Sequence, residues 1–220
     1  MSGEAGVRLV LASASPARLA TLRAAGLDPQ VQVSGVQEDI PVGAATEDLC
    51  ARLATAKAYA VAERLQGSEA WVLGCDSLLD LDGEAYGKPR TAAAAVQRWR
   101  RMSGRSGTLH TGHCVVHTSA SSAARGLTRV AATVVHFAEV SAAEMEAYAA
   151  TGEPVDVAGA FTLDGLGGAF VTRVEGDPHN VVGVSLPLLR EMLAEMGLAW
   201  LSVWPQPPAL TRRAARAPGR

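Results

Sequence analysis

The sequence predicts an α/β protein with a mixed β-sheet and flanking helices. Apolar strand-like runs alternate with helical segments in the first half of the chain, an order typical of α/β folds. Two long strand-like stretches then follow one another across a short polar loop, which predicts an antiparallel pair. Apolar residues make up 48% of the 220 residues and charged residues 19%, which favours a globular protein over a disordered one.

The expected helices begin at capping residues. Ser15 followed by Pro16 is a typical helix start, because Ser accepts a hydrogen bond from the first turn and Pro fits within it. Thr46 and Thr91 are expected to cap two further helices, and Ser141 begins a capping box. The expected helices are 15–26, 46–66, 91–102, 141–152 and 186–196.

The expected strands are apolar runs bounded by turn residues. The run at 79–83, Leu-Asp-Leu-Asp-Gly, predicts a hairpin, and the loop at 119–126 connects the two long strands. Asp76 follows the most hydrophobic run and is expected at the end of its strand. The expected strands are 7–12, 31–34, 71–75, 108–118, 127–138 and 169–175.

Charge is distributed unevenly along the chain. The formal net charge is −2, but residues 1–204 carry 16 basic and 22 acidic groups, a net of −6. A body this acidic is not expected to bind nucleic acid non-specifically. The segment 205–220 is rich in Pro and Arg and contains no acid, which predicts a disordered tail after a single domain over 1–204.

Cysteine usage and hydropathy predict a cytoplasmic protein. The three cysteines are far apart and form no CxxC pair, which argues against a disulfide scaffold and for a reducing compartment. No apolar run reaches the roughly 18–20 residues of a membrane span. Glu4 and Arg8 disrupt the pattern of a signal peptide.

Lysine is rare in this chain. Eighteen of the 20 basic residues are arginine, and the two lysines are Lys57 and Lys88. Coding bias in a GC-rich genome explains the excess of arginine. Because lysine and arginine differ in shape and hydrogen bonding, the two lysines are nevertheless candidates for constrained positions.

The segment S-A-S-P-A-R at 13–18 is a candidate phosphate site. It lies where a strand passes into a helix, and the N-terminus of a helix attracts anions through its exposed N–H groups. Ser13 and Ser15 add hydroxyl groups, and Arg18 adds a guanidinium. An ordinary helix cap with a solvent-facing arginine is the alternative.

Four other charged residues are candidates for the site. Asp76 could bind a hard cation or act as a general base, or could simply begin a turn. Lys88 lies between Gly87 and Pro89 on an expected rigid loop. Lys57 on a helix and Glu38 in a loop could equally be solvated surface residues.

The histidines and Cys114 do not predict a metal or nucleophile site. His110, His113 and His117 lie on one expected strand, and because side chains alternate between faces, residues three apart such as His110 and His113 diverge. Cys114 adjoins His113, but side chains of neighbouring strand residues point to opposite faces, which favours a place in the core.

Taken in order, eight motifs resemble the Maf family of nucleoside triphosphate pyrophosphatases over about residues 7–196. They are S-A-S-P-A-R-L (13–19), V-Q-E (36–38), Ala54-Lys57-Ala58, G-C-D-S (74–77), G-K-P (87–89), S-G-R with T-G (103–105, 111–112), G-E-P with A-G (152–154, 158–159) and the G-D-P-H-N-V-V-G to L-P-L run (176–188).

The resemblance implies a two-lobed α/β fold with a central cleft, usually a dimer, that hydrolyses nucleotides between the α and β phosphates. By position, Asp76 is the expected proton acceptor, and Glu38 and Asp76 are the expected ligands of a divalent cation, Mg²⁺ or Mn²⁺. The residues expected around the triphosphate are Ser13, Ser15, Arg18, Lys57 and Lys88.

The chain also departs from the usual pattern of this family. Ala17 stands where many members have an arginine, Val157 replaces the usual lysine, and Asp164 the usual glutamine. Positions 17, 77 and 164 bear on base choice, and the combination of Ala17, Ser77 and Asp164 matches neither the pyrimidine-type nor the methylguanine-type pattern. The resemblance therefore implies the chemistry and leaves the preferred base open.

Three hypotheses of function follow. The first is a metal-dependent pyrophosphatase that removes non-standard or surplus nucleotides. The second is a binding or regulatory protein linked to cell division, with weak or vestigial activity. The third is a phosphatase that releases orthophosphate. The presence of Arg18, Glu38, Lys57, Asp76 and Lys88 favours the first.

Overall fold

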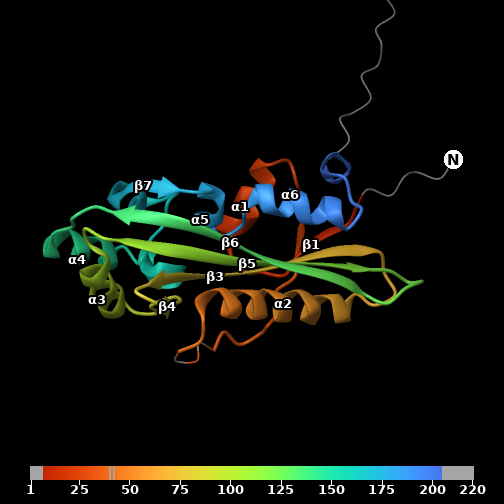
Figure 1. Cartoon of the computed structure of the whole chain (residues 1–220), viewed down its shortest axis with the longest axis horizontal. Coiled ribbons are helices and arrows are strands. Elements are labelled where there is room, and N and C mark those ends of the chain that lie inside the picture. Colours follow the sequence, from red (N-terminus) through yellow and green to blue (C-terminus); the bar gives the residue numbers. More distant parts are fainter. Residues whose placement is uncertain (1–6, 40, 42, 205–220) are drawn as a thin grey trace, which may run out of the picture.

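A mixed β-sheet of seven strands runs through the molecule (Figure 1). The strands are β1 (Leu9–Leu11), β2 (Gln30–Val31), β3 (Ala70–Leu81), β4 (Glu84–Tyr86), β5 (Ser106–Thr118), β6 (Arg125–Phe137) and β7 (Val171–Glu175). Their order is β2-β1-β3-β5-β6-β7, with β4 paired to β3. Only the pairs of β1 with β2 and β3 are parallel, which confirms the predicted mixed sheet. The structure is a computed structural model that describes residues 7–39, 41 and 43–204; the expected tail, 205–220, lies outside them.

Helices cover both faces of this sheet. They are α1 (Pro16–Ala24), α2 (Thr46–Arg64), α3 (Ala92–Met102), α4 (Ala142–Ala150), α5 (Pro178–Val182) and α6 (Leu186–Glu195), with short 3-10 turns η1 (Glu153–Asp156), η2 (Ala158–Ala160), η3 (Leu166–Phe170) and η4 (Trp200–Val203). In Figure 1, α2 lies along the lower face, α1, α5 and α6 lie above the sheet, and α3 and α4 lie at one end. The five predicted helices are all present.

The start of α2 and the short helix α5 differ from expectation. Ala45, not Thr46, is the cap of α2, and it makes no side-chain cap bond. The Thr46 hydroxyl instead donates to Asp80 Oδ2 at 2.6 Å, so a contact with β3 replaces local capping. The five residues of α5 are too few to show helical periodicity, although Asp177 caps them before a proline.

The hydrophobic core is divided along the sheet. One cluster packs the start of β3 against α6, for example through Leu73 and Leu189. A second packs the end of β3 against α3 and α4 around Trp99, whose ring meets those of Phe137 and Tyr148 edge-on. The middle of β3 therefore lies between two firmly packed regions.

The middle of β3 has a strand on one side only. Residues 71–73 pair with β1 and residues 79–81 pair with β4, whereas β5 pairs with β3 from Ala70 to Asp80. Along 74–78 the other edge of β3 is therefore left without a strand among the described residues. The expectation that the strand stops at residue 75 was wrong, because pairing with β5 continues through Asp76, which lies inside the strand and not at its end.

Candidate active site

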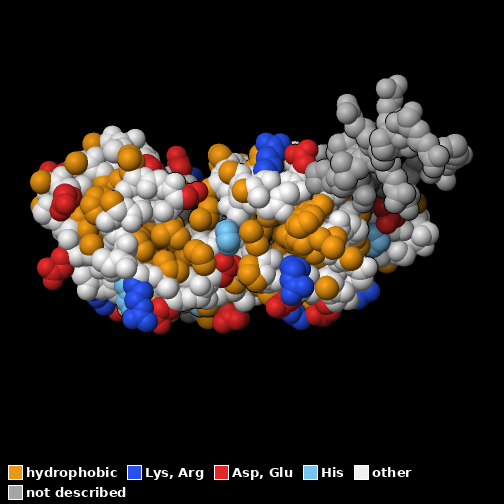
Figure 2. Space-filling model, turned by 90° about the horizontal axis from the view of Figure 1, so that it is seen from above, with side chains coloured by type: hydrophobic (Ala, Val, Ile, Leu, Met, Phe, Trp, Pro, Cys, Tyr) orange, Lys and Arg blue, Asp and Glu red, His pale blue; other side chains and the backbone are white. Residues whose placement is uncertain are grey.

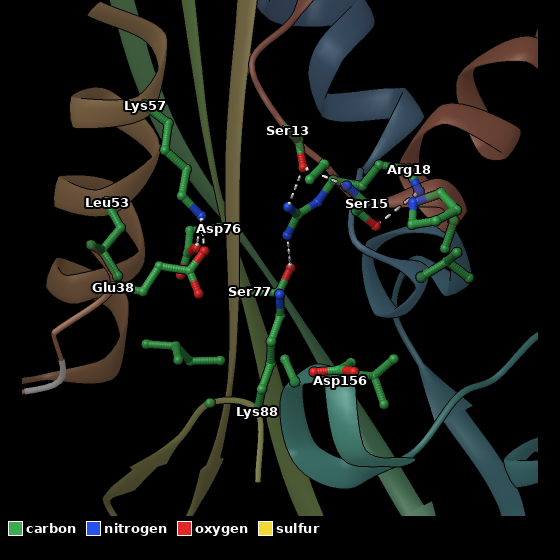
Figure 3. A pocket seen from close by; sticks show the side chains of 18 of the residues that line it. Ser13, Ser15, Arg18, Glu38, Leu53, Lys57, Asp76, Ser77, Lys88 and Asp156 are labelled. Carbon is green, nitrogen blue, oxygen red and sulfur yellow. Dashed lines mark hydrogen bonds and ion pairs between the residues drawn. The ribbon is translucent and has the colours of Figure 1, made fainter. Parts of the chain in front are cut away.

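A pocket of about 470 Å³ opens beside this uncovered edge of β3, a size typical of a small-molecule site. Residues of α2 line one side of the pocket, and residues of β3, α1, α5 and the η1–η2 segment line other parts of it, together with the loops before α2, after β4 and before η3 (Figure 3). Every residue predicted for the site lines this pocket: Ser13, Ser15, Ala17, Arg18, Glu38, Lys57, Asp76, Ser77, Lys88 and Asp164.

Two glycines allow α2 to pack directly on the sheet. A Cβ added to Gly74 in β3 or to Gly112 in β5 would lie only 2.4 Å or 2.2 Å from a backbone oxygen of α2. Asp76 is paired with Gly112 and lies on the same face of β3 as Gly74. The close approach of the helix therefore brings Lys57 of α2 onto Asp76.

Lys57 joins two carboxylates at the side of the pocket. Its Nζ donates to Glu38 Oε1 at 2.6 Å and also to Asp76 Oδ1. Lys57 and Asp76 are only 4% and 5% exposed, and a buried charge is costly unless it is paired. The three groups therefore depend on one another, and Figure 3 shows both carboxylates turned toward the same ammonium group.

Glu38 remains ionised in this arrangement. Partial burial acts to raise the pKa of its carboxyl, but the hydrogen bond from Lys57 and the nearby charges of Lys88 and Arg18 outweigh burial. The pKa of Glu38 therefore lies below its ordinary value. An ionised carboxylate is the form that a divalent cation binds.

The loop from β1 into α1 presents hydroxyl and backbone groups to the pocket. Ser15 is the N-cap of α1, and its Oγ accepts from the Arg18 backbone N–H at 3.3 Å. Ser13 Oγ accepts from the Ser15 backbone N–H at 3.2 Å. The predicted cap and the predicted anion site are therefore compatible, since Ser15 caps the helix and the same turn lines the pocket.

Arg18 holds three parts of the chain together. Its Nε donates to the carbonyl of Gly183 at 2.8 Å, Nη1 donates to Ser13 Oγ at 3.0 Å, and Nη2 donates to Ser77 Oγ at 2.9 Å. The Ser77 hydroxyl also shares a hydrogen bond of 2.9 Å with Thr111 on β5. Arg18 is thus a rigidly placed cation at the pocket wall and not the solvent-facing residue of the alternative interpretation.

The loop after β4 carries two more cations. Lys88 is exposed, and in Figure 3 its side chain extends toward the middle of the pocket. Arg90 also lines the pocket, as does Asp156 of η1. Sequence reasoning missed both residues, although Arg90 directly follows Gly87-Lys88-Pro89 and Asp156 lies in the G-E-P stretch.

A single carboxylate organises the loop whose residues 162–164 line another part of the pocket. Glu153 accepts hydrogen bonds from Tyr148 Oη at 2.9 Å, from the backbone N–H groups of residues 166–167 at 3.0 Å, and from the Thr162 hydroxyl. These bonds close the loop that carries Asp164. In the sequence Glu153 stands out only as part of the G-E-P motif, because its partners 162, 166 and 167 carry no pattern that points to it.

The three residues expected to affect base choice all reach the pocket. Ala17 lines it from the first turn of α1, Ser77 from β3, and Asp164 from the exposed loop before η3. The Ser77 hydroxyl already binds Arg18 and Thr111, so Ser77 also fixes the position of the arginine.

Cys114 is buried in the core, as predicted, and neither Cys114 nor the three histidines of β5 line the pocket. His113 is buried, with Nδ1 donating to the Thr111 carbonyl and Nε2 accepting from the Ser185 backbone N–H. His117 bonds Glu69 at 2.7 Å, and burial raises the pKa of the Cys114 thiol. Among the described residues, no group of three or more His, Cys, Asp or Glu side chains is placed to hold a metal ion.

Two carboxylates nevertheless fit a divalent cation. Glu38 and Asp76 each place one oxygen on Lys57 Nζ, so the two carboxylates lie close together and each has a second oxygen that does not contact Lys57. Mg²⁺ is usually bound by one or two carboxylates, with waters and substrate phosphates completing its coordination. Two carboxylates alone do not complete the coordination of such a cation. They are suited to a cation that binds together with the phosphates of a ligand.

Comparison with known proteins gives the family. The model of the family described as "Maf-like protein" matches residues 8–196, which include every residue of the site. The chain belongs to the Maf-like family. The chain is 55% identical over 207 residues to a protein of Salinispora tropica named nucleoside triphosphate pyrophosphatase, an alignment that covers 93% of this chain and 90% of that protein.

Other relatives of the Maf-like chain carry the same name. A Nocardia farcinica protein is 50% identical, covering 90% of this chain and 97% of its own length. A Streptomyces coelicolor protein is 51% identical, and the alignment covers 90% of this chain and 94% of that protein. Both are named nucleoside triphosphate pyrophosphatase. The relatives are thus similar over nearly their whole length, so the likeness is not confined to one motif.

Proposed function

We propose that this chain hydrolyses a nucleoside triphosphate to a nucleoside monophosphate and pyrophosphate. Water adds to the α-phosphorus, the bond from the α-phosphorus to the α,β-bridging oxygen breaks, and one proton is released. The observation that carries the proposal is the convergence of Asp76, Glu38 and Lys57 in a pocket that also contains Arg18 and Lys88. The name shared by the relatives supports the same reaction.

Each group has a role in this reaction that its position supports. Asp76 orients the attacking water and accepts its proton. Arg18, Lys57 and Lys88 stabilise the negative charge that develops on the phosphates, and Ser13 and Ser15 position their oxygens. Because Arg18 and Lys57 are held in place by hydrogen bonds before substrate binds, these two cations need little reorganisation in the transition state.

A divalent cation completes the proposed site. Glu38 and Asp76 are the residues that would hold Mg²⁺ or Mn²⁺, and the cation would supply charge neutralisation of the phosphate oxygens. Lys57 lies between the same two carboxylates and keeps them together before the cation arrives.

Product analysis tests this function. The purified protein is incubated with a panel of standard and modified nucleoside triphosphates and Mg²⁺ or Mn²⁺, and the products are identified by chromatography. Monophosphate with pyrophosphate is the expected result, and a preference for modified nucleotides would support a role in removing them. Orthophosphate would indicate a phosphatase. Nucleotide binding without turnover on any member of the panel would favour the regulatory alternative.

The setting of the enzyme is also proposed. All three cysteines are free and buried, which supports a reducing compartment and hence the cytoplasm. None of the described helices is long and apolar enough to cross a membrane.

The edge of the sheet supports association as a homodimer. Val31 and Val33 are about half exposed at and just beyond the edge strand β2. Light scattering after gel filtration measures the mass, and a dimer should show twice the mass of the 22.8 kDa chain.

A further inference from the structure

Arg90 has an unusual backbone conformation at the mouth of the pocket. Its φ is 67°, in the left-handed region that residues other than glycine rarely adopt. Its backbone N–H donates to the carbonyl of Val155 in η1 at 3.0 Å. This hydrogen bond fixes the residue where its side chain lines the pocket.

The Arg90 side chain spans two walls of the pocket by weak contacts. Nη1 lies 3.5 Å from Asp156 Oδ1, and Nη2 lies 3.8 Å from Glu38 Oε2. The arginine side chain is 60% exposed. Long ion pairs in contact with water contribute little stability, so a better acceptor can replace both carboxylates.

The pocket is lined by equal numbers of positively and negatively charged side chains. Its described ionisable residues are four cations (Arg18, Lys57, Lys88 and Arg90) and four anions (Glu38, Asp76, Asp156 and Asp164). A triphosphate therefore enters a pocket with no surplus positive charge. Lys57 already donates to two carboxylates and Arg18 to three neutral oxygens, whereas the side chain of Arg90 makes only long contacts and can move onto a phosphate at little cost.

We propose that Arg90 is a further substrate-binding residue. When a nucleotide binds, its guanidinium gives up its contacts with Glu38 and Asp156 and binds the phosphate chain. A guanidinium binds phosphate oxygens through paired N–H groups, which are stronger and shorter contacts than those it now makes. The move would also free Glu38 Oε2 for a cation. This inference rests on the proposed function.

Binding measurements with matched variants test the role of Arg90. Asn is suited to a positive φ, so Arg90→Asn removes the charge with little backbone strain, and Arg90→Lys keeps the charge. Arg173→Asn is the control, because Arg173 is 68% exposed on β7 and does not line the pocket. The probes are inorganic tripolyphosphate, α,β-methylene nucleoside triphosphates with each standard base, and the corresponding monophosphates, titrated calorimetrically with Mg²⁺.

We expect Arg90→Asn to weaken triphosphate and tripolyphosphate binding by about tenfold or more, with a smaller effect on monophosphates. Arg90→Lys should retain most of the affinity, and Arg173→Asn all of it. Equal affinity of Arg90→Asn and the wild type for triphosphates would overturn the role of Arg90 alone. Failure of the wild type to bind any triphosphate would overturn the proposed function and this inference together.

Thermal melting separates a binding role from a structural one. Glycine adopts a φ of 67° without strain, so Arg90→Gly should melt at the wild-type temperature or higher while losing affinity for tripolyphosphate. A variant that loses affinity only in proportion to a lowered melting temperature would show that Arg90 holds the loop and does not bind phosphate.

Discussion

At the scale of single residues, the site depends on one buried group of charges. Lys57 lies against Asp76 and Glu38, and each charge offsets the cost of burying the others. The scarcity of lysine first suggested that Lys57 and Lys88 occupy constrained positions, and both lie in the pocket. The two lysines differ in their surroundings, since Lys57 is buried and Lys88 is exposed.

The role of Asp76 predicts a large loss of activity on neutralisation. Asp76→Asn should lower kcat by about 10²-fold or more, because an amide cannot accept the proton of water. Asp82→Asn is the control: Asp82 is exposed on the β3–β4 turn with a φ of 60°, which Asn tolerates. Steady-state rates of pyrophosphate release measure both, and near-normal activity of Asp76→Asn would remove this residue from the proposed role.

The two lysines predict unequal responses to arginine. Lys57→Arg should lower kcat/KM by about tenfold or more and also lower the melting temperature, because the larger guanidinium does not fit the buried contact with two carboxylates. Lys88→Arg should have a smaller effect, since its exposed side chain has room. Full activity in both variants would mean that chance, and not a constraint of the site, explains why these two positions hold lysine.

At the scale of elements, the approach of α2 to the sheet builds the site. Gly74 and Gly112 leave room for the helix backbone, and the same face of β3 carries Asp76. Sequence reasoning placed Gly74 in a motif but could not supply this reason, because a contact between a helix and two strands depends on tertiary packing. It also ended the strand too early, since pairing with β5 is a non-local property.

The close packing of α2 on Gly74 predicts that Gly74→Ala displaces this helix. A Cβ there would clash with the helix backbone, so we expect a loss of about 1–3 kcal/mol of stability together with a strong loss of activity. Gly126→Ala is the matched control on β6, where the three atoms nearest to the added Cβ all belong to the side chain of Tyr59, which lies at the surface and can move. Denaturant unfolding and activity assays measure the difference; equal behaviour of the two variants would contradict this role of Gly74.

The loop held by Glu153 makes a second prediction at this scale. Glu153→Gln exchanges a carboxylate that accepts from four residues for an amide with one acceptor oxygen, at a cost of about 1–3 kcal/mol. Because the loop carries Asp164, relative kcat/KM values across a panel of nucleotide bases should become more alike. An unchanged base preference with lowered stability would limit Glu153 to a structural role.

Most elements and most of the proposed site residues could be predicted from the sequence, for a physical reason. Capping residues such as Ser15 and Ser141 act locally, so their helices are visible in short segments. The contacts of Arg18 with Gly183 and of Arg90 with Asp156 join residues far apart in the chain, and no local pattern encodes them. The resemblance placed Arg18 in the site, whereas nothing comparable pointed to Arg90.

At the scale of the whole molecule, a buried histidine links the sheet to α6. Burial lowers the pKa of His113 from 6.5 to about 4, and its neutral ring bonds the carbonyl of Thr111 and the N–H of Ser185, the N-cap of α6. Between these pH values the unfolded chain binds a proton that the folded chain does not. The contribution of His113 to stability is therefore fully present above pH 6.5 and falls as the pH is lowered toward 4.

This linkage predicts the acid sensitivity of the fold. Between pH 7 and pH 4, His113 should account for a loss of about 3 kcal/mol in the free energy of unfolding. His113→Gln, although less stable at pH 7, should lose less of its own stability over that range. Urea unfolding at a series of pH values gives both curves; parallel curves would show that other groups cause the acid loss.

The central claim is that this pocket directs water to the α-phosphorus of a nucleoside triphosphate. Hydrolysis in water labelled with heavy oxygen tests it most directly, because mass spectrometry of the products shows which phosphorus was attacked. The label should be found in the nucleoside monophosphate and not in pyrophosphate. Label in pyrophosphate, or release of labelled orthophosphate, would contradict the proposed reaction.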